Sequence, residues 1–430
     1  MAEAAAGVVA YEAVETVAQI GVGAYFLAKP TMPVKARLIQ IAASKDDDTK
    51  LSLARSGHSL TVVGSKAYIF GGETTSNKLA GNEVHAVSLE PTEKLEPEYS
   101  VFPAGTKDDE GAKVPSARTR HSACAFDERV AVYGGVDQSG QLIGDAPTIW
   151  LFNPAYHSWE ALDSLNPETQ PQPRSSAGLF AHQNNLILYG GVDTQGTLLK
   201  DTWHFDVTNR QWTPLPDAPV SSQHAALSDG VLYLISGSDM VGGDLHFLQL
   251  NAKSDEGQGW HTVPFPTTPL TPGPLPRAGA GLLPVSTGYG RQYLLYLFGA
   301  HTAGESAQAS ETAGEAGSAQ PAYWSDIWTY QLPSSDPELK ATTQIYEAMK
   351  PARIKDAIRG ALGVGSGKHS WGEVEVLPPG ELVPAAGKVH PGPRSSFACD
   401  VMKDKRSVAV WGGINPKGER EGDGWVIRLE

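Results

Sequence analysis

The 430-residue sequence contains little cysteine and little charge. Two cysteines, Cys124 and Cys399, cannot form a disulfide framework, which favours a reducing compartment. Only 19% of the residues are charged, and 48 acidic residues outnumber 34 basic ones. Binding to a phosphate backbone needs clustered Lys and Arg, and the sequence has no such block. We therefore expect no nucleic-acid partner.

Targeting and membrane signals are also missing. The N-terminal residues have no basic region, and Glu3, Glu12 and Glu15 interrupt the apolar core that a signal peptide needs. The uncharged stretch from Thr16 to Ala28 is too short to cross about 30 Å of hydrocarbon. No Asn-X-Ser/Thr glycosylation sequon occurs. We expect a soluble, cytoplasmic monomer with no membrane span.

Glycine and proline, in contrast, are abundant. The chain has 46 Gly and 31 Pro, well above their usual combined share of about 12%. With 40% hydrophobic residues and few charges, this composition argues against disorder and against long coiled coils. It is typical of short strands separated by many turns.

An internal repeat accounts for the turns. Six apolar segments each end in small residues followed by a turn. They are KAYIFGGE at 66–73, RVAVYGGVD at 129–137, NLILYGGVD at 185–193, VLYLISGSD at 231–239, YLLYLFGAH at 293–301 and SVAVWGGIN at 407–415.

An arginine precedes each Gly-Gly pair at a regular distance. The spacing is sixteen residues in the first three copies, which start at Arg55, Arg118 and Arg174. Arg277 and Arg394 take the same place at longer spacing, and Ser221 replaces arginine in the fourth copy. Downstream, an acidic residue often opens an aromatic strand, as in DTWHF at 201–205. Four short strands per unit at this period predict six propeller blades.

The ring must be closed by joining the two ends of the repeat. The sixth copy ends after its third strand, and the segment 34–42 alternates like a strand before the first copy. We predict that 34–42 completes the sixth blade. The domain organisation is then an N-terminal helical segment, 1–33, and one propeller, 34–430. Two insertions interrupt blade 5, at 301–324 and 334–368, and helical spacing of apolar residues predicts that 4–28 packs against the second.

The repeat, Arg-x-x-His, apolar strand, Gly-Gly, Asp-x-Trp and Trp-x-x-Leu, resembles the kelch repeat over nearly all of 34–430. The resemblance implies an all-β fold, a six-bladed kelch β-propeller closed by an N-terminal strand, with an N-terminal helix and a helical insertion in blade 5. It also implies that His58, His121 and His224 pack between blades and do not bind a metal. The repeated arginines are expected to make hydrogen bonds between blades and to stack on aromatic rings.

Metal and cofactor chemistry finds no support in the motifs. Galactose oxidase, another kelch propeller, uses a Cys–Tyr copper site, and neither cysteine here has a matching context. Kelch nitrile-specifier proteins bind iron through Glu-x-x-x-Asp-x-x-x-His, which is absent here. HExxH, P-loop and Gly-x-Ser-x-Gly motifs are missing as well. We expect no metal and no cofactor.

Candidate binding residues come from two repeat positions. The resemblance to kelch ligand sites implies that the second residue after each repeat arginine lies near the channel mouth, on the face that carries the long loops. The residues just after the Gly-Gly turn join them there. From these positions and the adjoining blade-5 insertion we select Arg120, Gln223, Asp239, His301, Trp324 and Glu73 as binding residues, and we assign no catalytic residue.

Two classes of function remain open. The chain resembles single-domain fungal kelch proteins, some of which act in specialised metabolism as hetero-Diels–Alderases. That resemblance implies a small organic substrate and a cofactor-free cyclase that works mainly by orientation. The alternative is a protein–protein interaction scaffold without catalytic activity. A closed apolar cavity of several hundred Å³ around Arg120 would favour the first class.

Overall fold

The structure, a computed structural model, describes most of the predicted propeller. The described residues are 34–43, 53–75, 78–92, 95–104, 113–144, 148–236, 244–251, 259–264, 273–287, 291–301, 323–332, 370–378 and 387–430. The proposed helices at 4–28 and 334–368, and Asp239, lie outside these ranges, as does the 301–324 insertion except for its two ends. The described part contains no helix that could span a membrane.

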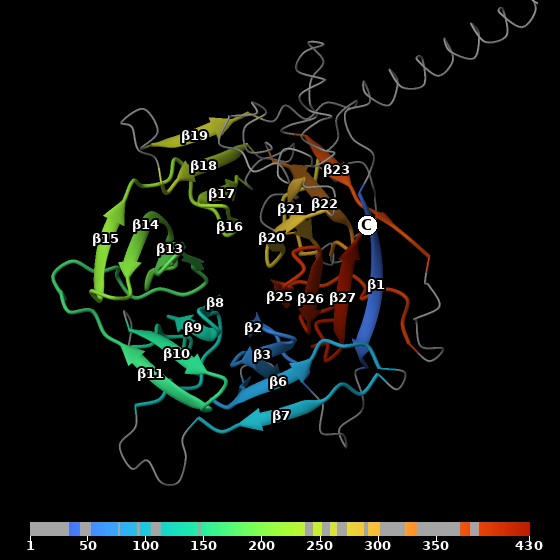
Figure 1. Cartoon of the computed structure of the whole chain (residues 1–430), viewed down its shortest axis with the longest axis horizontal. Coiled ribbons are helices and arrows are strands. Elements are labelled where there is room, and N and C mark those ends of the chain that lie inside the picture. The colour runs from blue at the N-terminus through green and yellow to red at the C-terminus, as the bar shows by residue number, and fades with distance from the viewer. Residues whose placement is uncertain are drawn as a thin grey trace, which may run out of the picture.

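Six antiparallel sheets surround a central axis (Figure 1), which confirms the predicted all-β six-bladed propeller. Five of the sheets are four-stranded meanders whose first strand lies nearest the axis, and the sixth contains five strands. Blade 1 contains β2 (Ser59–Val63), β3 (Lys66–Phe70), β6 (Val84–Ser88) and β7 (Tyr99–Phe102), with a small β4 (Glu73–Thr75) and β5 (Lys78–Leu79) hairpin between β3 and β6.

The next four blades repeat this order. Blade 2 contains β8 (Ser122–Phe126), β9 (Arg129–Tyr133), β10 (Ile149–Asn153) and β11 (Ser158–Leu162); blade 3 contains β12 (Gly178–His182), β13 (Asn185–Val192), β14 (Leu198–Asp206) and β15 (Gln211–Leu215). Blade 4 contains β16 (Ala225–Ser228), β17 (Val231–Ile235), β18 (Leu245–Gln249) and β19 (Trp260–Val263); blade 5 contains β20 (Gly281–Ser286), β21 (Gln292–Leu297), β22 (Ile327–Gln331) and β23 (Trp371–Glu373).

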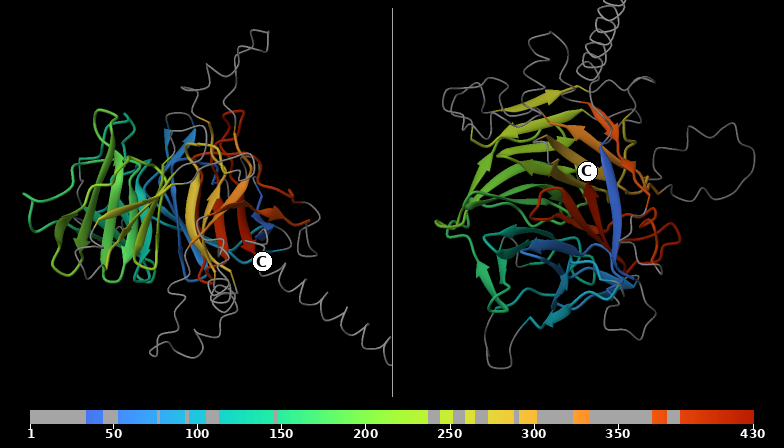
Figure 2. Two further views of the ribbon diagram at one scale, coloured as in Figure 1. Left: turned by 90° about the horizontal axis from the view of Figure 1, so that it is seen from above. Right: turned by 45° about the vertical axis from the view of Figure 1, so that its right-hand side comes forward.

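Blade 6 joins the two ends of the described chain. It contains β25 (Ala398–Val401), β26 (Ser407–Trp411) and β27 (Gly424–Leu429), and β1 (Lys35–Ala42) pairs antiparallel with β27. The register runs from Ala36 opposite Leu429 to Ala42 opposite Gly424, and Figure 2 shows β1 along the outer side of β27. The predicted closing strand is therefore present. A further strand that was not predicted, β24 (Glu375–Val376), pairs parallel with β1 and is the fifth strand of this sheet.

The blades are held together by apolar side chains on both faces of each sheet. The second strands show this best, because four of the five residues of β3 and of β9 are buried. The largest side chains interlock across the seam between two blades: Tyr133 of blade 2 packs edge-on against Trp212 of blade 3, with ring centroids 5.9 Å apart. A sheet buried on both faces needs apolar residues at successive positions, which explains the continuous apolar runs in the sequence.

Strand direction divides the loops between two faces of the ring. The start of each innermost strand, the Gly-Gly turn and the connection to the next blade share one face, which we call the loop face. The short turns between the first and second strands share the opposite face. Every repeat arginine therefore lies at the loop face.

Candidate functional site: the channel and its mouth

Residues at one repeat position form a hydrogen-bonded chain around the mouth of the central channel. The position is the second after each repeat arginine. Arg120, Ser176 and Ser396 all have positive φ there, at 54°, 52° and 53°, and Gly57 and Gly279 have φ of 62° and 61°. Positive φ is unusual for a residue with a side chain, and it marks a backbone conformation that surrounding contacts enforce.

The enforcing contacts are bonds from blade to blade. The Arg120 N–H donates to the carbonyl of Gly57 at 2.9 Å, and the Ser176 N–H donates to the carbonyl of Arg120 at 2.7 Å. On the other side, the Gly57 N–H donates to Ser396 at 3.0 Å, and the Ser396 N–H donates to Gly279 at 2.9 Å. These five residues of blades 1, 2, 3, 5 and 6 are called the mouth ring below.

Blade 4 does not join the mouth ring. Its residue at this position, Gln223, has no positive φ and makes no backbone bond to Ser176 or Gly279 among the described residues. The chain just before it is held by Tyr189 of blade 3, whose hydroxyl accepts from the Ser222 N–H at 3.1 Å. The Ser222 hydroxyl donates to the carbonyl of Ile235 at 2.6 Å. This arrangement replaces the missing repeat arginine.

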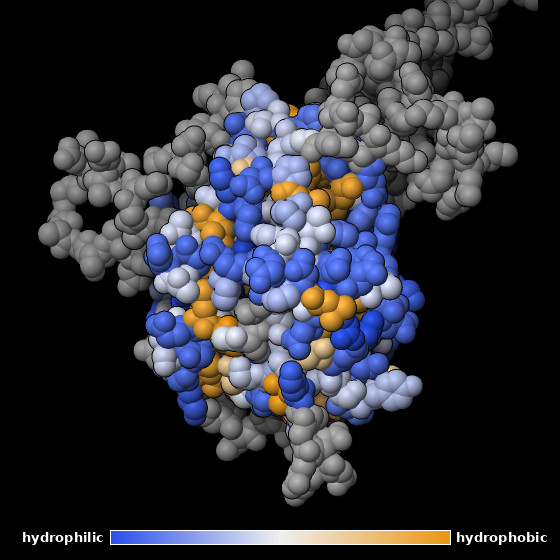
Figure 3. Space-filling model, turned by 90° about the vertical axis from the view of Figure 1, so that its left-hand side faces the viewer, coloured by the Kyte–Doolittle hydropathy of each residue, from blue (hydrophilic) through white to orange (hydrophobic). Residues whose placement is uncertain are grey.

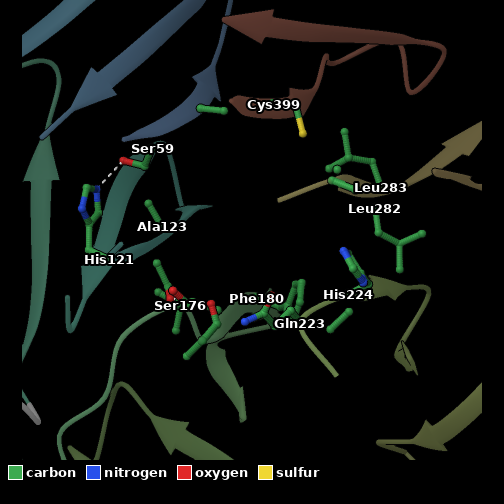
Figure 4. A pocket seen from close by; sticks show the side chains of 18 of the residues that line it. Ser59, His121, Ala123, Ser176, Phe180, Gln223, His224, Leu282, Leu283 and Cys399 are labelled. Atoms are coloured by element: carbon green, nitrogen blue, oxygen red, sulfur yellow. Dashed lines mark hydrogen bonds between the residues drawn. The ribbon is translucent and has the colours of Figure 1, made fainter. Parts of the chain in front are cut away.

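The channel below the mouth encloses a cavity of about 250 Å³ lined by the innermost strands of all six blades. Figure 4 shows these side chains around the open centre, with Ser176, Phe180 and Gln223 along one side of it. Lining residues include Ser59, Ala123, Phe180, Gln223, Leu283 and Cys399. The walls are therefore mixed, with hydroxyl and amide groups beside aliphatic and aromatic ones.

Three blades carry a pair of a buried arginine and an aspartate just outside the channel, and in one of them, Arg394–Asp423, the aspartate is buried as well. Arg174 donates to both carboxylate oxygens of Asp201, at 2.6 and 2.8 Å, and to the carbonyl of Gly190 at 2.9 Å. Arg277–Asp326 and Arg394–Asp423 repeat this geometry in blades 5 and 6. Each of these side-chain pairs lies within its own blade. The expected hydrogen bonds between blades are made by the arginine backbone: the carbonyls of Arg174 and Arg394 accept from the N–H groups of Gly135 and Gly299 in the preceding blades, at 3.1 and 2.8 Å. The expected aromatic stacking is found at Arg277, over Tyr296 and Trp324.

Two of these pairs, those of blades 3 and 6, lower the pKa of their carboxylates. Burial by itself would raise the pKa of Asp201, but hydrogen bonds from Arg174 and from the Trp203 indole outweigh it and hold the pKa below its ordinary value. The pKa of Asp423 is lowered by Arg394 against the same opposing effect of burial. The pairs are structural and keep both charges in the folded state.

The three repeated histidines pack between blades, as the kelch resemblance implied. The Nε2 atom of His121 lies 2.8 Å from the hydroxyl of Ser59 in blade 1, and His224 packs edge-on against Tyr296 of blade 5. Burial lowers the pKa of His121 to about 3 and that of His224 to about 4, so both rings are neutral. Among the described residues, no group of His, Cys, Asp and Glu could hold a metal ion.

The two cysteines are half-buried and unreactive at neutral pH. Cys399 lines the channel, and burial raises the pKa of its thiol to about 12. Burial also raises the pKa of Cys124 above its ordinary value. Because the thiolate is the reactive form, neither residue is a nucleophile at neutral pH.

The selected binding residues are distributed around the mouth and do not form one group. Gln223 lines the channel cavity. Arg120 is exposed in the mouth ring, and its side chain makes no hydrogen bond or ion pair to any described residue. Glu73 is bound to Arg420 at 2.7 Å, and the Trp324 ring lies beside the Arg277 guanidinium, 5.6 Å away. His301 is half-buried at the end of the blade-5 turn, and Asp239 lies outside the described residues.

Sequence reasoning missed the apolar part of the channel wall. Phe180 and Leu283 both line the cavity and both stand six residues after a repeat arginine. A comparison of that position across the six copies would have found them. The displacement of Gln223 has a signal too, because blade 4 is the copy in which serine replaces the arginine.

The fold and the repeat together define a six-bladed β-propeller of kelch type. The sequence profile of the KLHDC2/KLHL20/DRC7 Kelch-repeats domain matches residues 57–299. The chain belongs to this kelch-repeat family.

Individual relatives match parts of the chain. Kelch domain-containing protein 1 of Mus musculus is 27% identical over 35% of this chain and 33% of its own length. Beta-scruin of Limulus polyphemus is 28% identical over 25% of this chain and 12% of its own length. The N-(sulfonatooxy)prop-2-enimidothioate sulfolyase of Thlaspi arvense is 24% identical over 38% of this chain and 44% of its own length. The alignments thus span less than half of each of these relatives.

A solved structure agrees with the fold. The structure of YjhT superposes with a TM-score of 0.55 at 14% sequence identity, over 88% of this chain and 98% of that one. At this identity the similarity concerns the fold alone.

Proposed function

We propose that the propeller is a protein-recognition module whose partner docks on the loop face over the channel mouth. The observation that carries the proposal is Arg120, an exposed arginine in a chain with a net charge of −14. Its backbone is fixed by ring bonds on both sides. A partner would therefore meet a positioned guanidinium at the centre of this face, where glycine or serine occupies the other ring positions.

Other surfaces offer less. Figure 3 shows the outer rim of the ring on the side of β11 and β15, where hydrophobic side chains form small groups separated by hydrophilic ones. Large exposed hydrophobic side chains are scattered as well, such as Tyr156 at 81% exposure and Leu165 at 69%. Protein partners usually need a contiguous patch with one or two anchoring residues, and arginine is among the side chains enriched at such points.

A small organic substrate in the channel is the second candidate, and Gln223, which lines the cavity, is the observation in its favour. This candidate includes the cofactor-free cyclase of fungal specialised metabolism. Ligand pockets usually measure about 300–1,000 Å³, whereas the channel cavity measures about 250 Å³ and Arg120 does not line it. We therefore rank the cyclase behind the recognition module.

Site-specific photocrosslinking tests the recognition module. A benzoylphenylalanine at Ser396, in the mouth ring, should crosslink a partner in cell extract, and one at Ser65, in the β2–β3 turn on the opposite face, should not. Once the partner is purified, Arg120→Glu should weaken binding at least tenfold in titration calorimetry. Lys417→Glu is the matched control, because Lys417 is an exposed cation in a blade-6 turn of the same face, and it should change affinity less than twofold.

Two results would contradict the proposed docking on the loop face. Equal crosslinking from both faces, or unchanged affinity in Arg120→Glu, would mean that the loop face is not the docking surface.

A further inference from the structure

The mouth ring stops at blade 4, and its two ends are backbone groups of opposite kind. In each bond of the ring, an N–H points to the preceding blade and a carbonyl points to the following blade. By this rule the carbonyl of Ser176 and the N–H of Gly279 both point towards blade 4. Neither makes a backbone hydrogen bond in the described part of the chain.

Gln223 does not fill this place. It would have to donate its N–H to Ser176 and accept from Gly279, as Arg120 does between its own neighbours. The Tyr189 hydroxyl instead holds the preceding residue, Ser222, and Gln223 stays exposed at the channel. Because solvent reaches this part of the mouth, the two backbone groups are accessible to a ligand.

A trans peptide group has the matching geometry. Its N–H and its C=O point in opposite directions from one plane. Each ring residue likewise presents a donor and an acceptor to opposite neighbours, although its N–H and its C=O belong to two successive peptide groups. Resting between blades 3 and 5, such a group would donate to the Ser176 carbonyl and accept from the Gly279 N–H. Unpaired backbone groups gain from such bonds where the surroundings are partly desolvated.

We propose that the break in the mouth ring at blade 4 is a subsite for a main-chain peptide group of a bound segment, with the Gln223 amide beside it. The subsite would bind main-chain groups of the segment whatever its side chains are. It would therefore orient an extended segment across the channel. The inference rests on the proposed recognition function and specifies where the partner's backbone lies. Arg120 lies two blades away, and so the two contacts would hold different parts of the same segment.

Amide hydrogen exchange tests the premise on the full chain. The N–H groups of Gly57, Arg120, Ser176 and Ser396 are bonded in the ring, and they should exchange at least a hundredfold more slowly than those of Gln223 and Gly279. Equal protection of Gly279 would show that the ring is closed in solution and would overturn the inference.

A titration tests the ligand class. The probe is acetyl-trialanine N-methylamide, and the matched probe carries N-methyl groups on its internal peptide bonds and cannot donate from them. In a ¹⁵N-resolved spectrum, the first should shift the Gly279 amide resonance saturably at millimolar concentration. The second should shift it at least tenfold less. Equal effects of the two peptides, or no effect of either, would overturn the inference.

A variant tests where the peptide probe binds. Gln223→Trp places a large ring on the exposed blade-4 residue at the break in the ring, and it should weaken the response of the Gly279 amide at least tenfold. Lys417→Trp, on the same face but outside the ring, is the control and should leave the response unchanged. A full response in Gln223→Trp would place the peptide elsewhere. The probe needs no natural partner, so its failure alongside a partner that still depends on Arg120 would remove this inference and leave the recognition function intact.

Discussion

Blades 3 and 4 are neighbours built from the same repeat, and they secure the loop face in different ways. In blade 3, Arg174 has a side chain that is 0% exposed and it binds Asp201 with two hydrogen bonds. In blade 4, the same region depends on the Ser222 hydroxyl, which bonds the Ile235 carbonyl, and on the Tyr189 hydroxyl of the neighbouring blade.

The two blades therefore differ both in the contacts that stabilise the loop face and in how open the channel mouth is beside them. A buried ion pair fixes the start of the innermost strand and thereby aligns Ser176 with the mouth ring. Two neutral hydroxyl contacts hold blade 4 without that alignment, and Gln223 stays at the open channel. The repeat arginine is therefore needed for a regular mouth and is dispensable for a folded blade.

The largest effect on this comparison is expected from Arg174→Ala. The variant leaves the Gly190 carbonyl and the partly exposed Asp201 carboxylate without their main partner, and the loss of hydrogen bonds from a charged group costs about 3 kcal/mol. Urea unfolding followed by tryptophan fluorescence would measure the loss. Arg210→Ala, which removes an arginine that is 42% exposed beside Glu160, is the control and should cost less than about 0.5 kcal/mol.

A loss below about 1 kcal/mol in Arg174→Ala would break the comparison. Blade 3 would then be stabilised by apolar packing against its neighbouring blades alone. Blade 4 would be in the same situation without the Ser222 hydroxyl.

A smaller effect is expected from Asp201→Asn, and it depends on pH. The amide keeps an acceptor for Arg174 but loses the charge, which should cost about 2 kcal/mol at pH 7. The pKa of Asp201 is lowered in the folded state, so its contribution is present above the unfolded pKa of about 3.9 and is lost as pH falls through the folded pKa. The stability difference between the two proteins should therefore shrink below about pH 4.

Unfolding curves at pH 7 and at pH 3 would measure this. A difference that stays constant over that range would mean that the carboxylate charge is not what stabilises the pair.

Blade 4 provides the next effect. Ser222→Ala removes the bond to the Ile235 carbonyl and the bond accepted from the His224 N–H at 3.0 Å, and a neutral hydrogen bond contributes about 0.5–1.5 kcal/mol. We expect a loss of about 1 kcal/mol, measured by the same unfolding assay. Ser221→Ala, at the exposed preceding residue, is the matched control and should be neutral. Equal effects in the two variants would show that the Ser222 hydroxyl does not substitute for the arginine.

The sequence predicts well the regular features that the blades share. Six copies in register locate the blades, the closing strand and the arginines, because those features rest on local spacing and on apolar runs. The sequence did not predict the mouth ring, because its bonds join residues of different blades that lie far apart in the chain, such as Gly57 with Arg120 and Gly57 with Ser396. For the arginines, repeat position shows which residues are equivalent but not which of their groups bonds where: the carbonyl accepts from the neighbouring blade, whereas the side chain bonds within its own blade.

The site residues divide in the same way. Gln223 and Arg120 were selected at the repeat position that forms the mouth, where the structure places both. Glu73 and Trp324 were selected for proximity to the same turn, but their side chains are engaged by Arg420 and Arg277. Whether a polar side chain is already satisfied depends on residues hundreds of positions away, as for Glu73 and Arg420, and a single sequence does not show it.

The smallest expected effect belongs to Ser221→Arg, which restores the repeat residue in blade 4. The new guanidinium could reach Asp244, the counterpart of Asp201, but it would have to displace the Ser222 contacts and lose solvent. Burying an ion pair is close to neutral when its gain only matches its desolvation, so we expect a change below about 1 kcal/mol in unfolding free energy. A gain above about 2 kcal/mol would mean that blade 4 is an incomplete copy whose stability was lost with the arginine. A neutral result together with slower exchange of the Gly279 amide would separate the two properties: the arginine would close the mouth ring while adding no stability to the blade.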